Sequence, residues 1–443
     1  MWRLALPVLL LACAVPASTQ VNKSNLTGVV SDPSGGAVPA AAMRLVNTGT
    51  GAVRQESTDP MGFYRFTLLD FGTYRLEVER KGFKKSVRGG IQLQTGETTT
   101  VDVRLEVGEL AESVTVTAES PLLRTETGSA GATVDRQAVN ELPLIGRNPY
   151  LFVKLAAGIQ YFSGDAGAVN PWDVLAPSGF AASGSKARSE FLLDGIPNMI
   201  PAGVSFSPSP DAVEEMRLQT STYDAEYGHS GAAFVNVSTK AGSNQAHGSI
   251  SWFLRNDNLN ANSFFNNLSG AGKSETKQNT YGAALSGPAY LPTLYHGHDR
   301  THYSVVFEGT RIRRAAMLWD LVPSQRERAG DFSFTTDRQG RPFRIYDSLT
   351  TQPSGGGYVR DPFPGNLIPG SRHDAVALNA MKFYPLPNKV PTPENWSNFE
   401  HANPTGLNWA SLSTRVDHQL SSAHTLFLRY GWNHRFDPSE PYY

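Results

Sequence analysis

The stretch from Val213 to Phe265 decides the fold, and it reads VEEMRLQTSTYDAEYGHSGAAFVNVSTKAGSNQAHGSISWFLRNDNLNANSFF. Its pattern changes around Gly242 to Gly248. Before this point short apolar runs are broken by turn residues, which is typical of a small globular module. From His247 onward apolar and polar residues alternate, which is typical of a strand whose two faces meet different surroundings. The sequence therefore predicts a join at which a globular module ends and a sheet of long strands begins.

The same alternation recurs downstream of the join. Apolar side chains share one face in each candidate strand, and polar side chains occupy the other. About ten alternating residues per strand is the pattern of an outer-membrane barrel. The five predicted strands span 247–255, 281–287, 302–311, 412–418 and 424–432. The inward face carries charged residues, which we expect to meet the globular module: Arg255, Glu308, Arg415, Asp417 and Arg429.

The connections between these strands alternate in length. Residues 256–280 and 312–410 form long connections, whereas 288–301 is shorter and 420–423 is tight. Barrels of this kind have short periplasmic turns and long external loops, so the first strand is expected to run outward. Barrels with a filled lumen have about 22 strands. Five strands cannot close around a module, so we expect the chain to be the N-terminal part of a longer protein.

Composition agrees with a β-rich exported protein. The chain has 443 residues, a net charge of -1, 41 glycines and 29 prolines. The balanced charge gives no basic field for nucleic acid. Residues 1–17 predict a signal peptide, with Arg3 before an apolar core and Ala17 at the cleavage site. The stretch before the only cysteine, Cys13, also resembles a lipoprotein box, which is the alternative for this segment.

Residues 22–107 predict a β-sandwich, because short alternating strands follow one another with turn clusters between them. Tyr74, Leu76 and Val78, for example, alternate with charged residues. Aromatic residues such as Tyr64 and Tyr74 fit two interpretations. They fill the core, or they stack on sugar rings. The segment from Val114 to Thr117, which reads VTVT, is likewise open to two interpretations: a last edge strand of the sandwich, or a strip that pairs with the sheet of another protein.

Several successive motifs resemble known families. Gly28-Val29-Val30, Thr58-Asp59 and Gly72-Thr73-Tyr74 resemble the carboxypeptidase regulatory-like domain. Residues 133–243 resemble the plug domain of TonB-dependent transporters, above all the Oar-like receptors, and the matching motifs are Leu142–Asn148, Phe191–Pro197, Val213–Gln219, Ala225–Gly228 and Val235–Gly242. Here the Asp194-Gly195 pair, Gly228 and Gly242 are expected to have structural roles in turns.

The resemblance implies a plug, a truncated barrel over 247–443 and a linker over 108–132 that carries the TonB box at Val114, Thr115, Val116 and Thr117. It also implies an outer-membrane location, with TonB, membrane lipid and an extracellular ligand, glycan or peptide, as partners. The resulting fold class is mainly β: an Ig-like or starch-binding-like sandwich, an α+β plug and the start of an antiparallel barrel. The alternative function is a surface module that binds carbohydrate or peptide without transport.

Catalytic and metal-binding patterns are weak in this sequence. His296, His298 and His302 could supply metal ligands, but His302 begins a strand pattern and no Glu follows His298 as a metalloprotease motif requires. The chain has no Gly-x-Ser-x-Gly nucleophile elbow. We therefore predict a protein that is not an enzyme and needs no cofactor or metal.

Overall fold

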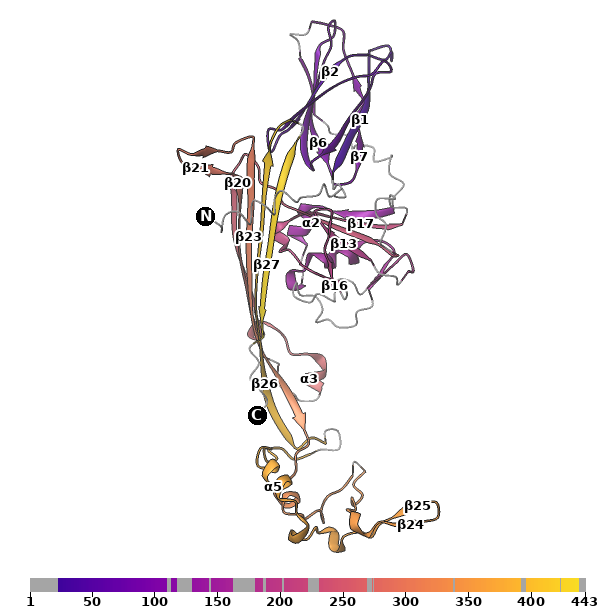
Figure 1. The fold of residues 1–443 in the computed structure, drawn as a ribbon, viewed down its shortest axis with the longest axis vertical. Coiled ribbons are helices and arrows are strands. Elements are labelled where there is room, and N and C mark those ends of the chain that lie inside the picture. The colour runs from indigo at the N-terminus through magenta and orange to yellow at the C-terminus, as the bar shows by residue number, and fades with distance from the viewer. Residues whose placement is uncertain are drawn as a thin grey trace, which may run out of the picture. The chain divides into compact units, whose positions relative to one another are not determined.

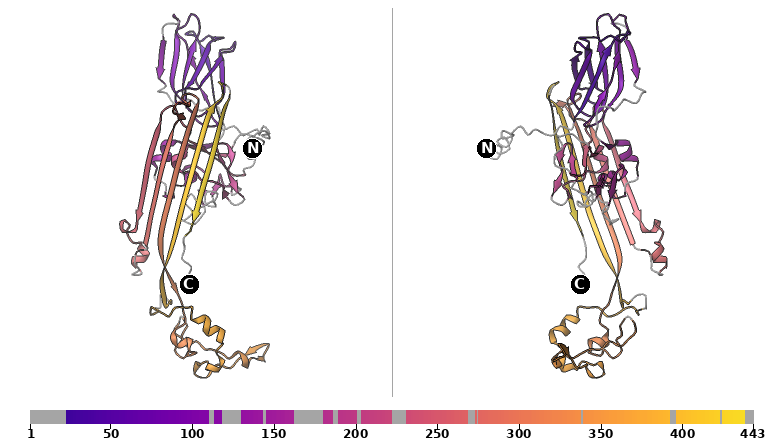
Figure 2. Two further views of the ribbon diagram at one scale, coloured as in Figure 1. Left: turned by 60° about the vertical axis from the view of Figure 1, so that its left-hand side comes forward. Right: turned by 90° about the vertical axis from the view of Figure 1, so that its right-hand side faces the viewer.

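The computed structural model describes most of the chain (Figures 1 and 2). The described residues are 23–109, 113–117, 130–142, 145–161, 180–185, 189–200, 203–221, 231–268, 273, 275–337, 339–391, 396–422 and 424–437. The predicted signal peptide and Gly228 lie outside them. The chain divides into two compact units, of which one comprises residues 1–252, 280–309 and 409–435, and the other 253–279, 310–408 and 436–443. No helix among the described residues has the length and apolar character needed to cross a membrane.

The N-terminal part is a sandwich of two sheets, as the alternating pattern predicted. One sheet has the order β4-β1-β7, with β8 also paired to β1, and the other has the order β3-β2-β5-β6-β9. The strands are β1 Ser24–Ser31, β2 Ala42–Asn47, β3 Val53–Ser57, β4 Phe63–Leu69, β5 Gly72–Glu79, β6 Lys85–Leu93, β7 Thr98–Thr100, β8 Val103–Arg104 and β9 Ser113–Thr117.

Inward-facing side chains from both sheets of the sandwich form one core. Leu26, Leu76 and Ile91 are among its fully buried members. A Cβ at Gly28 would lie 2.1 Å from the carbonyl oxygen of Val101, so only glycine lets these two backbones approach so closely. This close approach at Gly28 places β1 directly against the chain that leads into β8.

Residues 130–242, called the central module below, form an α+β unit around one sheet. The sheet order is β10-β17-β18-β13-β14, in which β18 runs antiparallel to β17 and parallel to β13. Its elements are β10 Ala130–Val134, α2 Arg136–Glu141, η1 Ile145–Arg147, η2 Pro149–Leu155, β11 Ile159–Tyr161, β12 Phe180–Ala182, β13 Glu190–Leu193, β14 Ile196–Pro197, β15 Met199–Ile200, β16 Gly203–Val204, η4 Pro210–Ala212, β17 Val213–Ser221 and β18 Phe234–Thr239.

Local sequence explains the helix start and the core of the central module. Asp135 caps α2, because its carboxylate accepts a hydrogen bond from the Ala138 amide at 2.9 Å. Tyr150 and Phe191 meet edge to face, with ring centroids 5.4 Å apart. The alternating residues of β17 and β18 bury Met216, Val235 and Val237 against them.

Five long strands follow and pair in sequence order, a sheet called the long-strand sheet below (Figure 2). They are β19 His247–Asn256, β20 Glu275–Pro288, β23 Thr301–Asp320, β26 Phe399–Gln419 and β27 Thr425–Phe436. Exposure alternates along β23 as predicted, because Phe307 is exposed whereas Ser304 and Glu308 are buried. The five strands are an incomplete barrel, since the order runs from β19 to β27 without joining them.

The predicted ends of three of these strands were wrong. β20 begins six residues earlier than 281, β23 runs on to Asp320, and β26 begins at Phe399 rather than at 412. The period of two is lost in the added parts, since β20 adds only polar residues over 275–280 and β23 adds the adjacent pairs Arg313-Arg314 and Ala315-Ala316. Backbone pairing does not need that period. Sequence periodicity therefore reported only the parts of the strands with one apolar face.

The connections contain short elements of their own. A hairpin of β21 Tyr290–Leu291 and β22 Tyr295–His296 lies between β20 and β23, and η5 Asp257–Leu259 and α3 Phe264–Leu268 follow β19. Residues 321–398 contain α4 Gln325–Arg328, η6 Ser348–Thr350, β24 Gln352–Ser354, β25 Gly357–Val359, η7 Pro364–Asn366, η8 Gly370–Arg372 and α5 Ala375–Met381.

Asn366 organises this long connection. Its amide group donates to the carbonyl oxygens of Phe332 and Phe343 at 2.6 and 2.7 Å, and its side-chain oxygen accepts from the Ile345 amide at 2.7 Å. Three segments distant in sequence therefore meet at one side chain.

Candidate functional site: polar contacts between the central module and the long-strand sheet

Glu308 is the first anchor of the central module on the long-strand sheet. It lies on the inward face of β23 and is only 1% exposed. Its carboxylate accepts hydrogen bonds from Arg147 Nε and Ser209 Oγ, both at 2.8 Å. Arg147 also pairs with Asp211 at 2.8 Å. A buried carboxylate needs such partners, because its transfer from water is otherwise very costly.

The backbone of the central module presents Arg147 for this contact. Arg147 has a φ of 56°, which is uncommon for a residue other than glycine. It follows Gly146, whose φ is 77°. This left-handed pair turns the chain between α2 and η2. The strained conformation is compensated by the two carboxylates that the guanidinium reaches.

Asp194 is the second anchor, and it lies in the turn between β13 and β14. Its carboxylate accepts from the amide and hydroxyl of Thr239, both at 2.7 Å. Arg415 of β26 donates to Asp194 at 3.1 Å, and Arg429 of β27 lies within 3.3 Å of the same carboxylate. Arg415 also pairs with Asp417 at 2.8 Å and donates to the Thr239 carbonyl at 3.0 Å.

Both anchors place opposite charges on the two bodies at a buried surface. Charge-assisted hydrogen bonds of this kind are strong and directional, and they fix the register of two surfaces. The sequence predicted that the inward charges of the long strands meet the globular module, and contacts confirm this for Glu308, Arg415 and Arg429. Asp417 reaches the module through Arg415, and Arg255 is an exposed residue of β19.

Sequence reasoning missed the partners of these charges on the central module. Asp194 and Gly195 were expected only to form a turn, and they do lie between β13 and β14 with φ of 52° and 77°. The turn geometry gave no sign that the Asp194 carboxylate also binds two arginines. A useful signal was available: Asp194 follows an apolar strand directly, and unpaired inward arginines needed an acceptor.

The remaining predicted residues fall at several places. Val114–Thr117 belong to β9, the edge strand that pairs in parallel with β6, so that Val114 lies opposite Ser86 and Thr117 opposite Gly89. A Cβ at Gly242 would lie 2.4 Å from the carbonyl oxygen of Tyr303, which requires glycine at this close approach to β23.

Tyr64 and Tyr74 lie in the core of the sandwich. They are 1% and 4% exposed, and their hydroxyls donate to the carbonyls of Val101 and Asp70. Burial raises the pKa of both phenols. Neither ring has a face open to a sugar, so this structure supports the interpretation that they fill the core.

The candidate histidines do not gather around one point. His296 and His298 have ring centroids 6.3 Å apart, and His298 faces Asp299 at 3.0 Å. His302 instead bonds to the Asn244 side chain at 2.9 Å. Within the described part of the chain no three His, Cys, Asp or Glu side chains are grouped for a metal ion.

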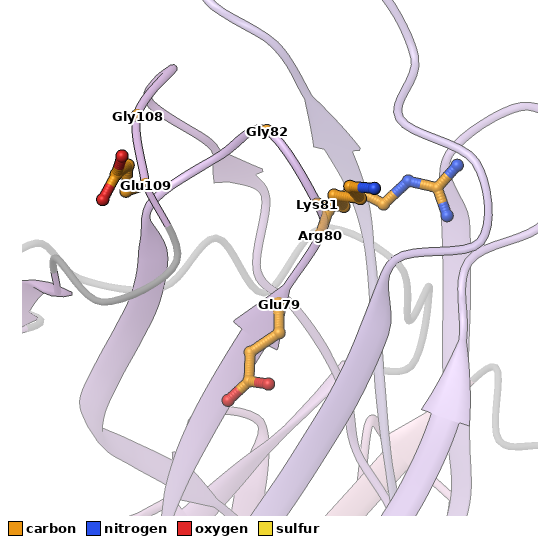
Figure 3. A pocket seen from close by; sticks show the side chains of 6 residues that line it. All are labelled: Glu79, Arg80, Lys81, Gly82, Gly108 and Glu109. Carbon is orange, nitrogen blue, oxygen red and sulfur yellow. The ribbon is translucent and has the colours of Figure 1, made fainter.

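A shallow hollow lies on the sandwich beside the start of the segment that leads to β9 (Figure 3). It is lined by Glu79, Arg80, Lys81, Gly82, Gly108 and Glu109. The side chains of Glu79, Arg80 and Glu109 point in different directions in Figure 3. Arg80 is engaged with the carbonyl of Ala40 at 2.8 Å. Binding sites for small molecules need convergent polar groups, so this hollow does not define one.

Comparison with known proteins gives the class of protein. Residues 238–443 match the outer membrane beta barrel domain, and residues 25–106 match the carboxypeptidase regulatory-like domain. These matches give the chain an outer-membrane location, with an N-terminal sandwich followed by the strands of an outer membrane beta barrel domain. These two matches agree with the two β-rich parts described above.

A TonB-dependent transporter is similar to about half of the chain. The TonB-dependent transporter Oar of Myxococcus xanthus is 29% identical over 241 residues, which are 51% of this chain and 21% of that protein. The chain is a homologue of this TonB-dependent transporter and spans about a fifth of its length.

Two solved structures are also similar. A ferric enterobactin receptor from Pseudomonas aeruginosa in complex with enterobactin is 12% identical and covers 71% of this chain and 34% of its own, with a TM-score of 0.35. The siderophore receptor PirA from Acinetobacter baumannii is 13% identical and covers 73% of this chain and 34% of its own, with a TM-score of 0.34.

Proposed function

We propose that the chain is the N-terminal part of an outer-membrane receptor that takes up an extracellular ligand with energy delivered by TonB. In this proposal the central module acts as the plug of a barrel to which the long-strand sheet contributes. The observation that carries the proposal is the pair of buried polar anchors, Arg147–Glu308 and Asp194–Arg415. The homology to a TonB-dependent transporter supports it.

The anchors suit a plug that must be held firmly and released on demand. If the contacts were apolar, movement of the plug would expose apolar surfaces to water. Carboxylates and guanidinium groups instead exchange their partners for water, which recovers part of the free energy lost on separation. A pull on the plug therefore leaves the charged groups of both anchors hydrated.

The edge strand β9 is the proposed handle for TonB. Strands pair with a partner's sheet edge through backbone hydrogen bonds, and β9 lies at the edge of the sheet β3-β2-β5-β6-β9. Its residues Val114, Thr115, Val116 and Thr117 are the proposed contact residues. The proposed extracellular ligand is a glycan or a peptide.

Binding to TonB tests the proposal. The complete gene product would be purified in detergent, and its affinity for the periplasmic domain of TonB measured by titration calorimetry. Val116→Pro removes a backbone donor from β9, so we expect at least tenfold weaker binding. Val53→Pro on the opposite edge strand β3 is the matched control and should bind as the wild type does. Equal binding by all three proteins would contradict the assignment of β9.

A further inference from the structure

The turn that follows β6 docks the sandwich on the central module through Thr95. This residue is 1% exposed, and all of its polar groups are used. Its amide donates to Glu215 Oε1 at 2.8 Å, its carbonyl accepts from Arg217 Nη1 at 2.6 Å, and its hydroxyl lies 3.1 Å from the Ser238 hydroxyl. The contact is therefore a specific clamp between two folded bodies.

The central module is built to receive this turn. Glu215 and Arg217 are two residues apart on β17, so their side chains point to the same face of the sheet. Both are buried, at 6% and 9% exposure. Burial raises the pKa of Glu215, and the hydrogen bonds from Thr95 offset part of that rise. Without the sandwich, this carboxylate and this guanidinium would lose partners that buried charges require.

A second contact ties the sandwich to the long-strand sheet. The Gly49 carbonyl, in the turn between β2 and β3, accepts from the Asn244 amide at 2.8 Å. Asn244 in turn bonds through its side chain to the amide of Asp299 at 2.8 Å, just before β23. A Cβ at Gly51 would lie 2.0 Å from the Asp299 carboxylate, so the turn sits directly against this residue.

A third contact covers one of the anchors. The Arg415 guanidinium, which holds Asp194, lies 5.8 Å from the centre of the Phe71 ring of the sandwich. Phe427 of β27 contacts the same guanidinium at 5.0 Å. Aromatic faces attract such cations and exclude water from them. Ser238, which Thr95 contacts, is also the neighbour of Thr239, the residue that binds Asp194.

We propose that the docked sandwich is a retaining bracket, which holds the central module against the long-strand sheet and shields the Asp194–Arg415 anchor from water. The reason is geometric. A body that contacts both the module and the sheet must give up one set of contacts before those two separate. This role concerns the resting state and needs neither TonB nor ligand, although it rests on the proposed function of the module as a plug.

Ion leakage through the purified receptor tests the bracket. The complete gene product would be reconstituted in planar lipid bilayers in potassium chloride, and the frequency of conductance events recorded. Thr95→Val combined with Arg217→Met removes two of the clamp contacts, so we expect at least threefold more opening events. Ser34→Ala is the matched control, because its hydroxyl donates to Asp32 at 2.6 Å within a turn of the sandwich, and it should leave the frequency unchanged.

A disulfide supplies the reverse experiment. In Thr95→Cys/Ser238→Cys the two thiols replace hydroxyls that are 3.1 Å apart. Oxidation should link them and lower the opening frequency below that of the wild type, and a reductant should restore it. Failure of the thiols to join, or wild-type leakage in Thr95→Val/Arg217→Met, would overturn the proposal. Because TonB is absent, a negative result in the TonB titration leaves this measurement unaffected.

Discussion

Single side chains decide how the central module meets the long-strand sheet. Asp194 serves as a turn residue, an acceptor for Thr239 and the counter-ion of Arg415 and Arg429. Glu308 likewise accepts hydrogen bonds from two residues, Arg147 and Ser209. The sequence predicted the inward charges of the strands from their alternation. It could not predict their partners, because pairing between residues more than a hundred positions apart depends on the fold.

Asp194→Ala should loosen the central module strongly. The change removes the acceptor for Thr239 and leaves the buried Arg415 and the half-buried Arg429 without their shared counter-ion. Breaking a buried pair costs about 3–5 kcal/mol. Limited proteolysis of the reconstituted protein in rising urea would measure the effect. Asp211→Ala is the control, since its more exposed pair with Arg147 contributes about 1 kcal/mol or less. Equal sensitivity of the two variants would contradict the anchor role of Asp194.

Glu215 gives the stability of the central module a dependence on pH. Burial raises its pKa above the ordinary value of 4.5, and the pKa of neighbouring Glu214 is raised for the same reason. A raised carboxyl pKa means that the folded state holds its proton more tightly than the unfolded state does. Stability therefore falls as the pH rises from about 4.5 through the raised pKa, and is regained on acidification.

Glu215→Gln should remove part of this dependence. The amide oxygen can still accept from the Thr95 amide, while the titrating charge is gone. Between pH 4 and 8, the urea concentration needed to unfold the variant should change less with pH than it does for the wild type. Glu56→Gln on the exposed β3 is the control and should keep the wild-type slope. A variant at Glu215 with an unchanged slope would show that this carboxyl does not set the pH dependence.

At the scale of elements, periodicity found the strands but not their ends. All five long strands were predicted. The remaining parts of β20, β23 and β26 were not predicted, because they lack side-chain alternation and are held by backbone pairing. The parallel pairing of β9 with β6 was not predicted either, since it joins segments separated by the strands β7 and β8.

Asn366 should hold the long connection between β23 and β26 in shape. Asn366→Ala removes three hydrogen bonds and places alanine at a φ of 59°, where its Cβ is disfavoured. We expect amide hydrogen exchange in residues 330–368 to become at least tenfold faster. Asn379→Ala in α5 is the control, because its side chain bonds only locally, to Lys382, among the contacts described for it. Unchanged exchange in Asn366→Ala would show that other contacts hold the connection.

The same connection should depend on an acidic residue with a low pKa. Hydrogen bonds from Ser333 and Arg326 lower the pKa of Asp331 to about 2. Because its carboxyl pKa is lowered in the folded arrangement, Asp331 stabilises that arrangement at pH values above the ordinary carboxyl pKa. This contribution is lost as the pH falls toward 2. Hydrogen exchange near Asp331 should therefore accelerate on acidification more in the wild type than in Asp331→Asn, after correction for the intrinsic rate. Identical acceleration would contradict this.

At the scale of the whole molecule, three folded parts are fastened by polar contacts. The sandwich, the central module and the long-strand sheet each follow from their own sequence pattern. The matches to two domain families agree with the sandwich and the long-strand sheet. Their fastening does not follow from any pattern. Thr95, Gly49 and Phe71 lie in turns of the sandwich whose sequence gives no sign that they contact another part of the chain.

A cysteine at the interface between the central module and the long-strand sheet would detect their separation by TonB. Ser209 is 1% exposed and donates to Glu308. Ser209→Cys would be placed in the complete gene product in its native host, growing in rich medium, and treated with a membrane-impermeant maleimide. Labelling is expected in energised cells that contain TonB, and little labelling is expected in cells without TonB. Equal labelling in both would contradict it.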